Sequence, residues 1–464
     1  MIQLKFDYNN MMSHMVGGEG MDESGLAAAA TGMACACDSV AAKRGTGWQE
    51  WTELPYTPKK EIDELAAYGK KLGKEASSWV VFGIGGSALG PLAVATALLH
   101  LKHNDLPDAK RKAPKLFVED NVDPERMNAL LDVIDIKTSY FNVITKSGET
   151  SETLSQFLII YKLLKQKLGA IEAKKRIIVT TTVGKGSLYD VAAKEGFKIY
   201  GIGRGVGGRF SVLSAVGLLT FAVMGLDIHS MLDGARRMTE ASLDGDYKTN
   251  PALISAYLQV EAMKRGKNIS VMMPYADSLR YMSDFYCQLW GESLGKAKDT
   301  GGNTVNVGQT PAKALGVTDQ HSQIQLYTEG PYDKVVTFLE VLSFRSKSVI
   351  TDDADVNTGD FLKGRTLNEL INAERVATEF ALTKAKRLNM AVTFPEVNEA
   401  TIGEFLTYLM WQTAFAGHLL NIDAFDQPGV EEGKLATFAV FGRKGYEEKL
   451  KEMQSKKKDP KFII

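Results

Sequence analysis

The stretch "VITKSGETSETLSQF", residues 143–157, joins an apolar strand pattern to an apolar helix pattern through a turn rich in small polar side chains. Its four hydroxyls fall within seven residues and surround a lysine: Thr145, Lys146, Ser147, Thr150 and Ser151. Capping a helix requires one Ser or Thr, so four hydroxyls exceed what N-capping explains. Because open parallel sheets bind ligands at the carboxyl ends of their strands, the turn predicts a site for an anion of monophosphate size.

A second strand-to-helix turn lies earlier in the chain, in "VVFGIGGSALGP", residues 80–91. Glycines end the strand pattern and the helix pattern opens at Ser87, where free N–H groups would point at an anion. The glycines also fit a loose dinucleotide fingerprint, but Glu119 and Asp120 lie well beyond the expected spacing of about 20 residues, so NAD is not expected. Taken alone, a tight turn without a ligand explains this stretch equally well.

A third turn, "GVGGRFSVLSAVG", spans residues 205–217 and places Arg209 between a double glycine and the next helix pattern. An arginine there can direct its guanidinium at a developing oxyanion. A surface salt bridge is the simpler alternative.

Around these turns, short β-branched runs alternate with helical patterns, which predicts parallel sheets covered by helices. The first series predicts strands at 78–86, 115–120, 140–145, 176–182 and 197–203, with helices at 88–100 and 153–169. The second series predicts strands at 268–275, 322–328 and 335–341, with helices at 251–265, 278–296, 366–387 and 401–422.

We therefore predict an α/β fold of two α/β/α sandwich domains with mostly parallel sheets, residues 48–225 and 226–445, the second with a helical C-terminal segment. Residues 1–47 form an N-terminal segment whose Ala/Gly-rich patch fits a helix or a loop. Residues 446–464 read as a charged terminal helix and tail.

The composition limits the class of protein. With 464 residues and 44% hydrophobic content, the chain can fill two domain cores. A net charge of −1 provides no general attraction for nucleic acid or an anionic membrane. Its three cysteines suit a reducing compartment, the first ten residues lack an apolar signal stretch, and the longest apolar run, 215–226, falls short of the roughly 20 residues that span a bilayer. These features predict a cytoplasmic protein.

Several motifs together resemble a known family. "GIGGS" and "KSGET" resemble the phosphate-holding turns of the sugar isomerase (SIS) fold. "GGRFSVLSAVG", "QLWGESLGK", "TDQHSQIQLYTEG" and "FDQPGVEEGK" are similar, in their usual order, to signature segments of the phosphoglucose isomerase family in its compact bacterial form. The resemblance runs from about Trp48 to Gly445. It implies two SIS-type domains and the interconversion of glucose 6-phosphate and fructose 6-phosphate through ring opening and a cis-enediol, without a metal or organic cofactor.

The resemblance also assigns roles to individual residues. It implies that Glu292 is the base for the carbon-bound proton, that Lys434 lies near the C1 oxygen and that Arg209 adds positive charge. It implies that His321, expected at a strand start, opens the sugar ring from across a homodimer interface. The substrate-binding residues that it implies are Gly86, Ser87, Thr145, Lys146, Ser147, Thr150, Gly208, Gln288 and Gln427; many family members have Ser in place of Thr145.

Spacing supports part of this assignment. Gln288 and Glu292 lie four apart in a helical pattern and share a face, so an amide would lie beside the carboxylate. Spacing alone would not single out Glu292, because a carboxylate near a helix end is more often a solvated charge.

Three alternatives remain at this point. A dual-specificity phosphoglucose/phosphomannose isomerase would use the same base and phosphate turns. A non-catalytic sugar-phosphate-sensing SIS protein would need the turns but not Glu292, His321 and Lys434 together. A dehydrogenase is the weakest alternative.

Overall fold

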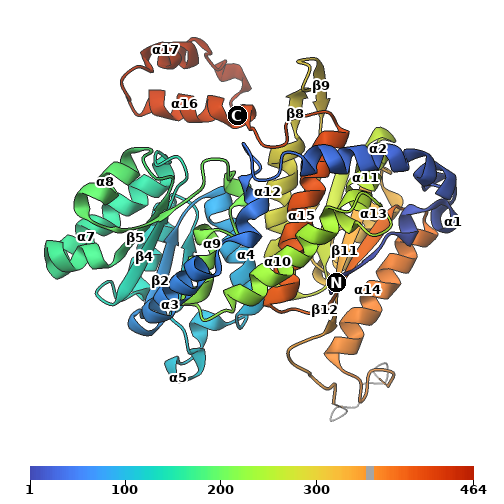
Figure 1. Cartoon of the computed structure of the whole chain (residues 1–464), viewed down its shortest axis with the longest axis horizontal. Helices are drawn as coiled ribbons and strands as arrows, with labels where there is room; N and C mark the ends of the chain where they lie inside the picture. The colour runs from blue at the N-terminus through green and yellow to red at the C-terminus, as the bar shows by residue number, and fades with distance from the viewer. Residues whose placement is uncertain (352–359) are drawn as a thin grey trace.

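The computed structural model describes residues 1–351 and 360–464 and contains two five-stranded sheets with a layer of helices between them (Figure 1). The first sheet is wholly parallel, in the order β3-β2-β4-β5-β6. Its strands are β2 (Ser78–Phe82), β3 (Lys115–Glu119), β4 (Ser139–Ile144), β5 (Ile177–Thr181) and β6 (Lys198–Gly201). All five coincide with predicted strands.

Alternation along β2 shows how the first sheet is covered on both faces. Trp79 and Val81 point into the central core, whereas Val80 and Phe82 point to an outer core. Such a doubly buried strand is apolar throughout, as parallel sheets require. The outer face is covered by α6 (Pro124–Val133), α7 (Ser151–Lys175) and α8 (Ser187–Glu195).

The second sheet has the order β1-β12-β11-β7-β10, in which β1 alone runs antiparallel. Its strands are β1 (Lys5–Asp7), β7 (Ile269–Pro274), β10 (Thr310–Lys313), β11 (Lys334–Ser343) and β12 (Asn389–Glu396). Helices α13 (Ile324–Glu329) and α14 (Leu367–Lys384) contribute to the core on its outer face. The predicted fold class, two α/β/α units with mostly parallel sheets, is confirmed.

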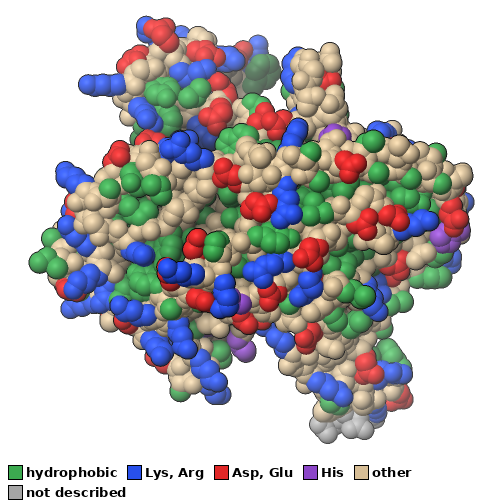
Figure 2. Space-filling model, viewed as in Figure 1, with side chains coloured by type: hydrophobic (Ala, Val, Ile, Leu, Met, Phe, Trp, Pro, Cys, Tyr) green, Lys and Arg blue, Asp and Glu red, His purple; other side chains and the backbone are tan. Residues whose placement is uncertain are grey.

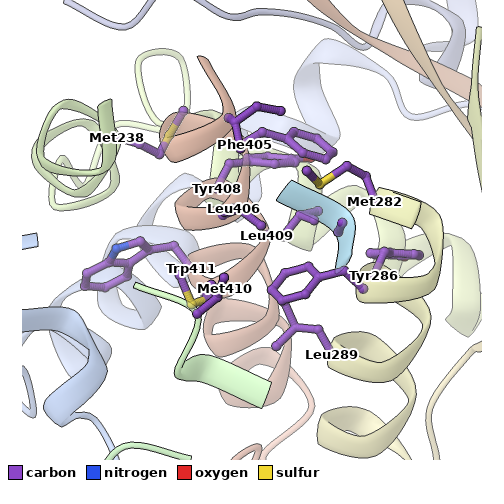
Figure 3. Packing of buried hydrophobic residues seen from close by; sticks show 14 of the residues in the cluster. Met238, Met282, Tyr286, Leu289, Phe405, Leu406, Tyr408, Leu409, Met410 and Trp411 are labelled. Atoms are coloured by element: carbon purple, nitrogen blue, oxygen red, sulfur yellow. The ribbon is translucent and has the colours of Figure 1, made fainter. Parts of the chain in front are cut away.

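The central core is built around α15, in which residues 400–417 are all buried. A helix that is buried on every side belongs in the middle of a domain. Its neighbours include α10 (Ile228–Ser242), α11 (Pro251–Lys264) and α12 (Arg280–Leu294), while α15 itself spans Glu399–Leu419. Figure 3 shows Tyr286 and Leu289 of α12 on the side of that helix that packs near α15, and α12 contributes buried residues to the central core from Met282 to Leu294.

Six further helices lie between or beside the elements described so far. They are α1 (Ser13–Val16), α2 (Glu23–Ala41), α3 (Lys59–Glu75), α4 (Leu89–Leu98), α5 (Asp108–Arg111) and α9 (Ala215–Val223). A two-stranded hairpin, β8 (Lys296–Lys298) with β9 (Thr304–Val307), follows α12.

The strand predicted at 322–328 is wrong, because this segment forms α13. Ile324 and Leu326 suggest alternation, yet Leu326 is exposed. Ile324 and Tyr327, three apart, pack on the outer core of the second sheet, and the Tyr327 hydroxyl donates back to Gln323. Helical spacing therefore describes the burial better than alternation does.

Other elements of the structure were not predicted from the sequence. Strands β10 and β12 were missed, and the open choice for the Ala/Gly-rich patch resolves as helix α2. Strand β1 pairs with β12 over Lys5–Asp7, so residues 1–47 take part in the second sheet. The domain boundaries themselves stay predictions.

The C-terminal residues form an arm that projects from the body (Figure 1). It comprises α16 (Glu431–Val440) and α17 (Glu447–Ser455), the latter within the predicted charged terminal helix. In Figure 2 the arm stands above the body as a separate lobe, and acidic and basic side chains are mixed over the visible face. In the described ranges, no helix combines the length and the apolar character needed to cross a membrane.

Candidate functional site

The hydroxyls of the turn after β4 converge on one point. Thr145 and Thr150 share a hydrogen bond of 2.6 Å between their Oγ1 atoms, and Ser147 Oγ lies 3.3 Å from Thr145 Oγ1. Thr150 precedes α7, yet no backbone N–H in the described chain donates to its side chain as a cap would. The capping alternative therefore fails for Thr150, and the cluster of hydroxyls stays available to an anion.

The glycine turn after β2 lies at the same edge of the sheet. β2 and β4 are adjacent and parallel, with Phe82 opposite Val143, so the two turns leave the sheet side by side. Ser87 ends a short 3-10 helix, Gly85–Ser87, that opens α4. The two predicted phosphate turns are thus brought together by strand order.

The Arg209 turn closes against the glycine turn. A Cβ on Gly86 would lie 2.1 Å from the carbonyl oxygen of Gly208, so a side chain cannot fit at position 86. Gly85 has φ +56°, and a Cβ there would approach Gln288 Nε2 to 2.7 Å. Glycine at these two positions lets the phosphate turns reach both Arg209 and α12.

Arg209 is held at every nitrogen of its guanidinium. Nε donates to Ser293 Oγ (2.6 Å), Nη1 to Gln427 Oε1 (2.6 Å) and Nη2 to the backbone oxygens of Ala424 (2.6 Å) and Asp426 (3.2 Å). Only 2% of Arg209 is exposed. The surface-salt-bridge alternative is therefore wrong: the cation is buried and its direction is fixed.

Glu292 faces this buried cation. Arg209 Nη1 lies 3.8 Å from Glu292 Oε1, and Gln288 Nε2 donates to Glu292 Oε2 at 3.1 Å. The carboxylate side chain is 21% exposed, so it is held on one side and open on the other. Burial lowers the pKa of Arg209, while the carboxylates of Glu292, Asp426 and Asp423 oppose that shift.

Lys146, within the turn after β4, contacts an aromatic side chain of the N-terminal part of the chain. Its Nζ lies 4.1 Å from the centroid of the Trp48 ring. That nitrogen is buried and has no hydrogen-bond partner among residues 1–351 and 360–464. Burial lowers the pKa of Lys146 to about 8, with a further lowering by Lys185 and an opposing effect of Glu50.

His321 does not stand at a strand start, as predicted, but ends the 3-10 helix Thr318–His321. The prediction fails together with the strand at 322–328, which is helical. His321 follows β10, whose Lys313 forms an ion pair with Asp284 near the beginning of α12. Glu292 lies eight residues later on α12, about 12 Å along its axis. No hydrogen bond or ion pair within the described chain joins His321 to Glu292.

Lys434 is likewise outside the cluster. It lies on α16 in the arm, its side chain is 52% exposed, and Nζ pairs with Glu431 Oε1 of the same helix at 2.8 Å. Gln427, only seven residues earlier, contacts Arg209, so the arm begins at the cluster and leads Lys434 away from it.

The structure adds residues that sequence reasoning did not select. Ser293 and the backbone at 424 and 426 orient Arg209. Ser293 directly follows Glu292 in a quoted motif, which is a signal that was available. Trp48 marks only the beginning of the regular pattern in the sequence, and nothing there indicates its contact with Lys146.

Comparison with known proteins identifies the family. Residues 60–458 match the family model described as phosphoglucose isomerase. The chain belongs to the phosphoglucose isomerase family. It is 50% identical to the glucose-6-phosphate isomerase of Carboxydothermus hydrogenoformans over 99% of both chains. The enzyme of the same name from Rubrobacter xylanophilus is 43% identical over 80% of this chain and 84% of its own. This family member is accordingly an isomerase.

Solved structures show the same fold. A protein of Thermus thermophilus, described as hypothetical, superposes with a TM-score of 0.85 at 34% identity, covering 95% of this chain and all of that one. A glucose-6-phosphate isomerase of Chlamydia trachomatis superposes with a TM-score of 0.82 at 20% identity, covering 98% and 92% of the two chains.

Proposed function

We propose that this isomerase interconverts glucose 6-phosphate and fructose 6-phosphate, with the phosphate held at the first sheet and the proton moved by Glu292. Ser87, Thr145, Ser147 and Thr150 offer hydroxyls to the phosphate from two adjacent turns, and Lys146 adds charge. Gly86 and Gly208 hold these turns against Arg209. A nearly neutral protein thus concentrates its binding of a dianion in one place.

Glu292 takes the proton from C2 of the open-chain aldose and returns it to C1. The observation that carries this role is the fixed geometry around its carboxylate: Gln288 orients one oxygen at 3.1 Å and Arg209 faces the other at 3.8 Å. The exposed side of the carboxylate stays free for the substrate. A positioned general base of this kind contributes roughly 10² to 10⁴-fold to the rate.

Arg209 stabilises the enediolate that forms when the carbon-bound proton leaves. Its guanidinium is already desolvated and aligned, so no reorganisation is needed as negative charge develops. In this proposal Gln427, whose Oε1 accepts a hydrogen bond from Arg209 Nη1, contacts the sugar as well.

His321 and Lys434 reach the site by two different routes. No hydrogen bond or ion pair within the described chain joins His321 to Glu292, which is consistent with His321 serving Glu292 of the other subunit in a homodimer. Lys434 reaches the C1 oxygen when the arm folds over the cluster at Gln427. Exposed apolar side chains on and near the arm support a partner surface: Val430, Val440, Phe441, Met453, Phe462, Ile463 and Ile464.

A cytoplasmic location is part of the same proposal. The three cysteines are all unpaired, as in proteins of a reducing compartment.

The test is a coupled assay that converts fructose 6-phosphate into glucose 6-phosphate and measures its oxidation, followed by isotope exchange. Wild type in D₂O is expected to take up deuterium at C1 and to exchange anomers. Glu292→Gln keeps the shape but removes the base, so anomer exchange should persist while label uptake falls by two or more orders of magnitude. Label uptake at the wild-type rate would exclude Glu292 as the base. Conversion of mannose 6-phosphate in a parallel assay would instead indicate the dual-specificity alternative.

A further inference from the structure

Trp48 contacts the phosphate-binding region although it lies outside every motif. It sits in the turn between α2 and a 3-10 helix, Glu50–Tyr56, and the centroid of its ring lies 4.1 Å from Lys146 Nζ. An ammonium over an indole face within about 6 Å is attracted by the ring quadrupole. The contact joins the N-terminal segment to the "KSGET" turn.

Lys146 has few other sources of stabilisation. Within the described residues its buried Nζ meets no hydrogen-bond acceptor. Lys185 and Arg209 add repulsion, which Glu50 opposes. An ammonium in such surroundings loses its hydration, and the ring face replaces part of it.

The exposure of Trp48 argues against a role in filling the core. Trp48 is 48% exposed, whereas Trp51, Trp79, Trp290 and Trp411 are almost fully buried. A large aromatic side chain that stays half in water gains little from burial. Its contact with a functional lysine is the feature that distinguishes it.

We infer that Trp48 is a positioning residue that holds the ammonium of Lys146 beside the phosphate turns, ready for the phosphate group of the substrate. This inference rests on the proposed function of those turns. Trp48 does not touch the reacting carbons, so it acts on substrate binding through Lys146 and leaves proton transfer at Glu292 unchanged.

The first test compares Trp48→Phe with Trp48→Leu. Phe keeps a ring face, whereas Leu keeps apolar bulk without a quadrupole. Trp48→Leu is expected to raise KM for fructose 6-phosphate by about two- to thirtyfold and to leave kcat within about twofold of wild type. Trp48→Phe should keep both KM and kcat within about twofold of wild type. Phe380→Leu, which removes an exposed ring on α14, is the matched control. Equal KM values for Trp48→Leu, Trp48→Phe and wild type would overturn the inference.

The second test uses the pH dependence of KM, which a merely structural role would not move. The pKa of Lys146 lies at about 8, so KM of wild type should rise as the pH passes through that value and the ammonium is lost. Trp48→Leu removes the ring while Lys146 stays buried, so the pKa of Lys146 falls and the rise in KM shifts to lower pH. Trp48→Ala admits water to Lys146, so its pKa rises and the rise in KM shifts to higher pH. Opposite shifts support the inference, and unshifted profiles overturn it.

A double-mutant cycle with Lys146→Met measures whether the effect of Trp48→Leu on KM depends on Lys146. If Trp48 acts through Lys146, then Trp48→Leu should change KM by less than about twofold in the Lys146→Met background. An undiminished effect would overturn the inference. Calorimetric binding of inorganic phosphate to the same variants gives this comparison without turnover. If wild type showed no isomerase activity, the proposed function would be wrong. The binding of inorganic phosphate to the same variants would still decide the role of Trp48.

Discussion

Two regions of the molecule carry the functional groups in contrasting ways. Around Arg209 the side chains are buried, cross-linked by short hydrogen bonds and anchored on α12, which packs along the central helix α15. On the arm, Lys434 is half exposed and pairs with Glu431 of its own helix. Under the proposed roles, the body is preorganised for the reaction, whereas the arm would have to move or be held by a partner before Lys434 could act.

The strongest way to break this comparison is to mix inactive subunits. His321→Ala and Glu292→Gln should each lose several orders of magnitude of activity. If His321 serves the neighbouring site, every mixed dimer holds one intact site, and random mixing should restore about one quarter of wild-type activity. The measurement is the coupled assay after co-refolding, with mixed dimers confirmed by differential tags. No recovery in confirmed mixed dimers would place both residues in the same chain's site.

Replacing Arg209 tests the preorganised region directly. Lys at this position keeps the charge but cannot make the same set of bonds from Nε, Nη1 and Nη2. We expect Arg209→Lys to lower kcat by about 10² to 10³-fold. Thermal unfolding, measured alongside, separates misfolding from lost catalysis: a folded variant with wild-type kcat would contradict the role in stabilising the enediolate.

Lys434→Ala tests the exposed region. A charge-assisted hydrogen bond to the sugar oxygen is worth about 1.5 to 3 kcal/mol, so kcat/KM should fall by about 10 to 150-fold. The Tm should stay the same because Lys434 is solvated and its partner Glu431 is exposed. Lys444→Ala, at an exposed position between α16 and α17, is the matched control. Equal activity of the two variants would show that the arm does not bring Lys434 to the site.

The phosphate hydroxyls should give a smaller effect, confined to binding. Ser147→Ala with Thr150→Ala removes two members of the converging cluster, and KM should rise at least tenfold, about 1.4 kcal/mol in binding. Ser155→Ala, one turn into α7, is a control that leaves the turn intact. An unchanged KM would remove these hydroxyls from the phosphate site.

The smallest effect is expected where the two regions meet. Arg443 lies between α16 and α17, and its Nη2 is 3.5 Å from Oε2 of Glu149 in the "KSGET" turn. Both side chains are well exposed. Such pairs contribute about 0 to 1 kcal/mol, so Arg443→Gln should change kcat/KM by less than about fivefold, and less still at high salt. Stopped-flow measurement at two salt concentrations checks this. A loss as large as that of Lys434→Ala would mean that this ion pair sets the position of the arm.

Prediction from sequence worked best where local pattern and burial agree. In the first sheet, the strands β2, β4 and β5 are buried on both faces and appear in the sequence as continuous, largely apolar runs. The edge strands β3 and β6 are only partly buried, but their short apolar runs were located as well. Prediction from sequence failed at 322–328, where an apparent alternation proved to be a helical face formed by Ile324 and Tyr327. Strand β12 was missed although it pairs along both edges, since its partners β1 and β11 lie far away in the chain.

In the candidate site, too, contacts between residues close in the chain were predicted, whereas contacts between distant residues were not. Gln288 and Glu292 were placed correctly relative to each other because i and i+4 share a helical face. The bonds of Arg209 to Ser293, Ala424 and Gln427 link positions 84 to 218 residues apart, which no local pattern reveals. The contact between Trp48 and Lys146 is equally long-range.

The sequence by itself determined most of the alternating elements, the position of the two proposed phosphate turns at strand ends and, through its ordered motifs, membership of the family. These properties depend on residues close together in the chain, where hydrophobic periodicity and turn chemistry act directly. Only the tertiary structure decided that Arg209 is buried against Glu292, that Gly86 must admit the Gly208 carbonyl, and that Lys434 pairs with Glu431 on the arm. Those outcomes follow from how sheets and helices pack over long separations, because burial and contact geometry are set by neighbours in space and not by neighbours in the chain.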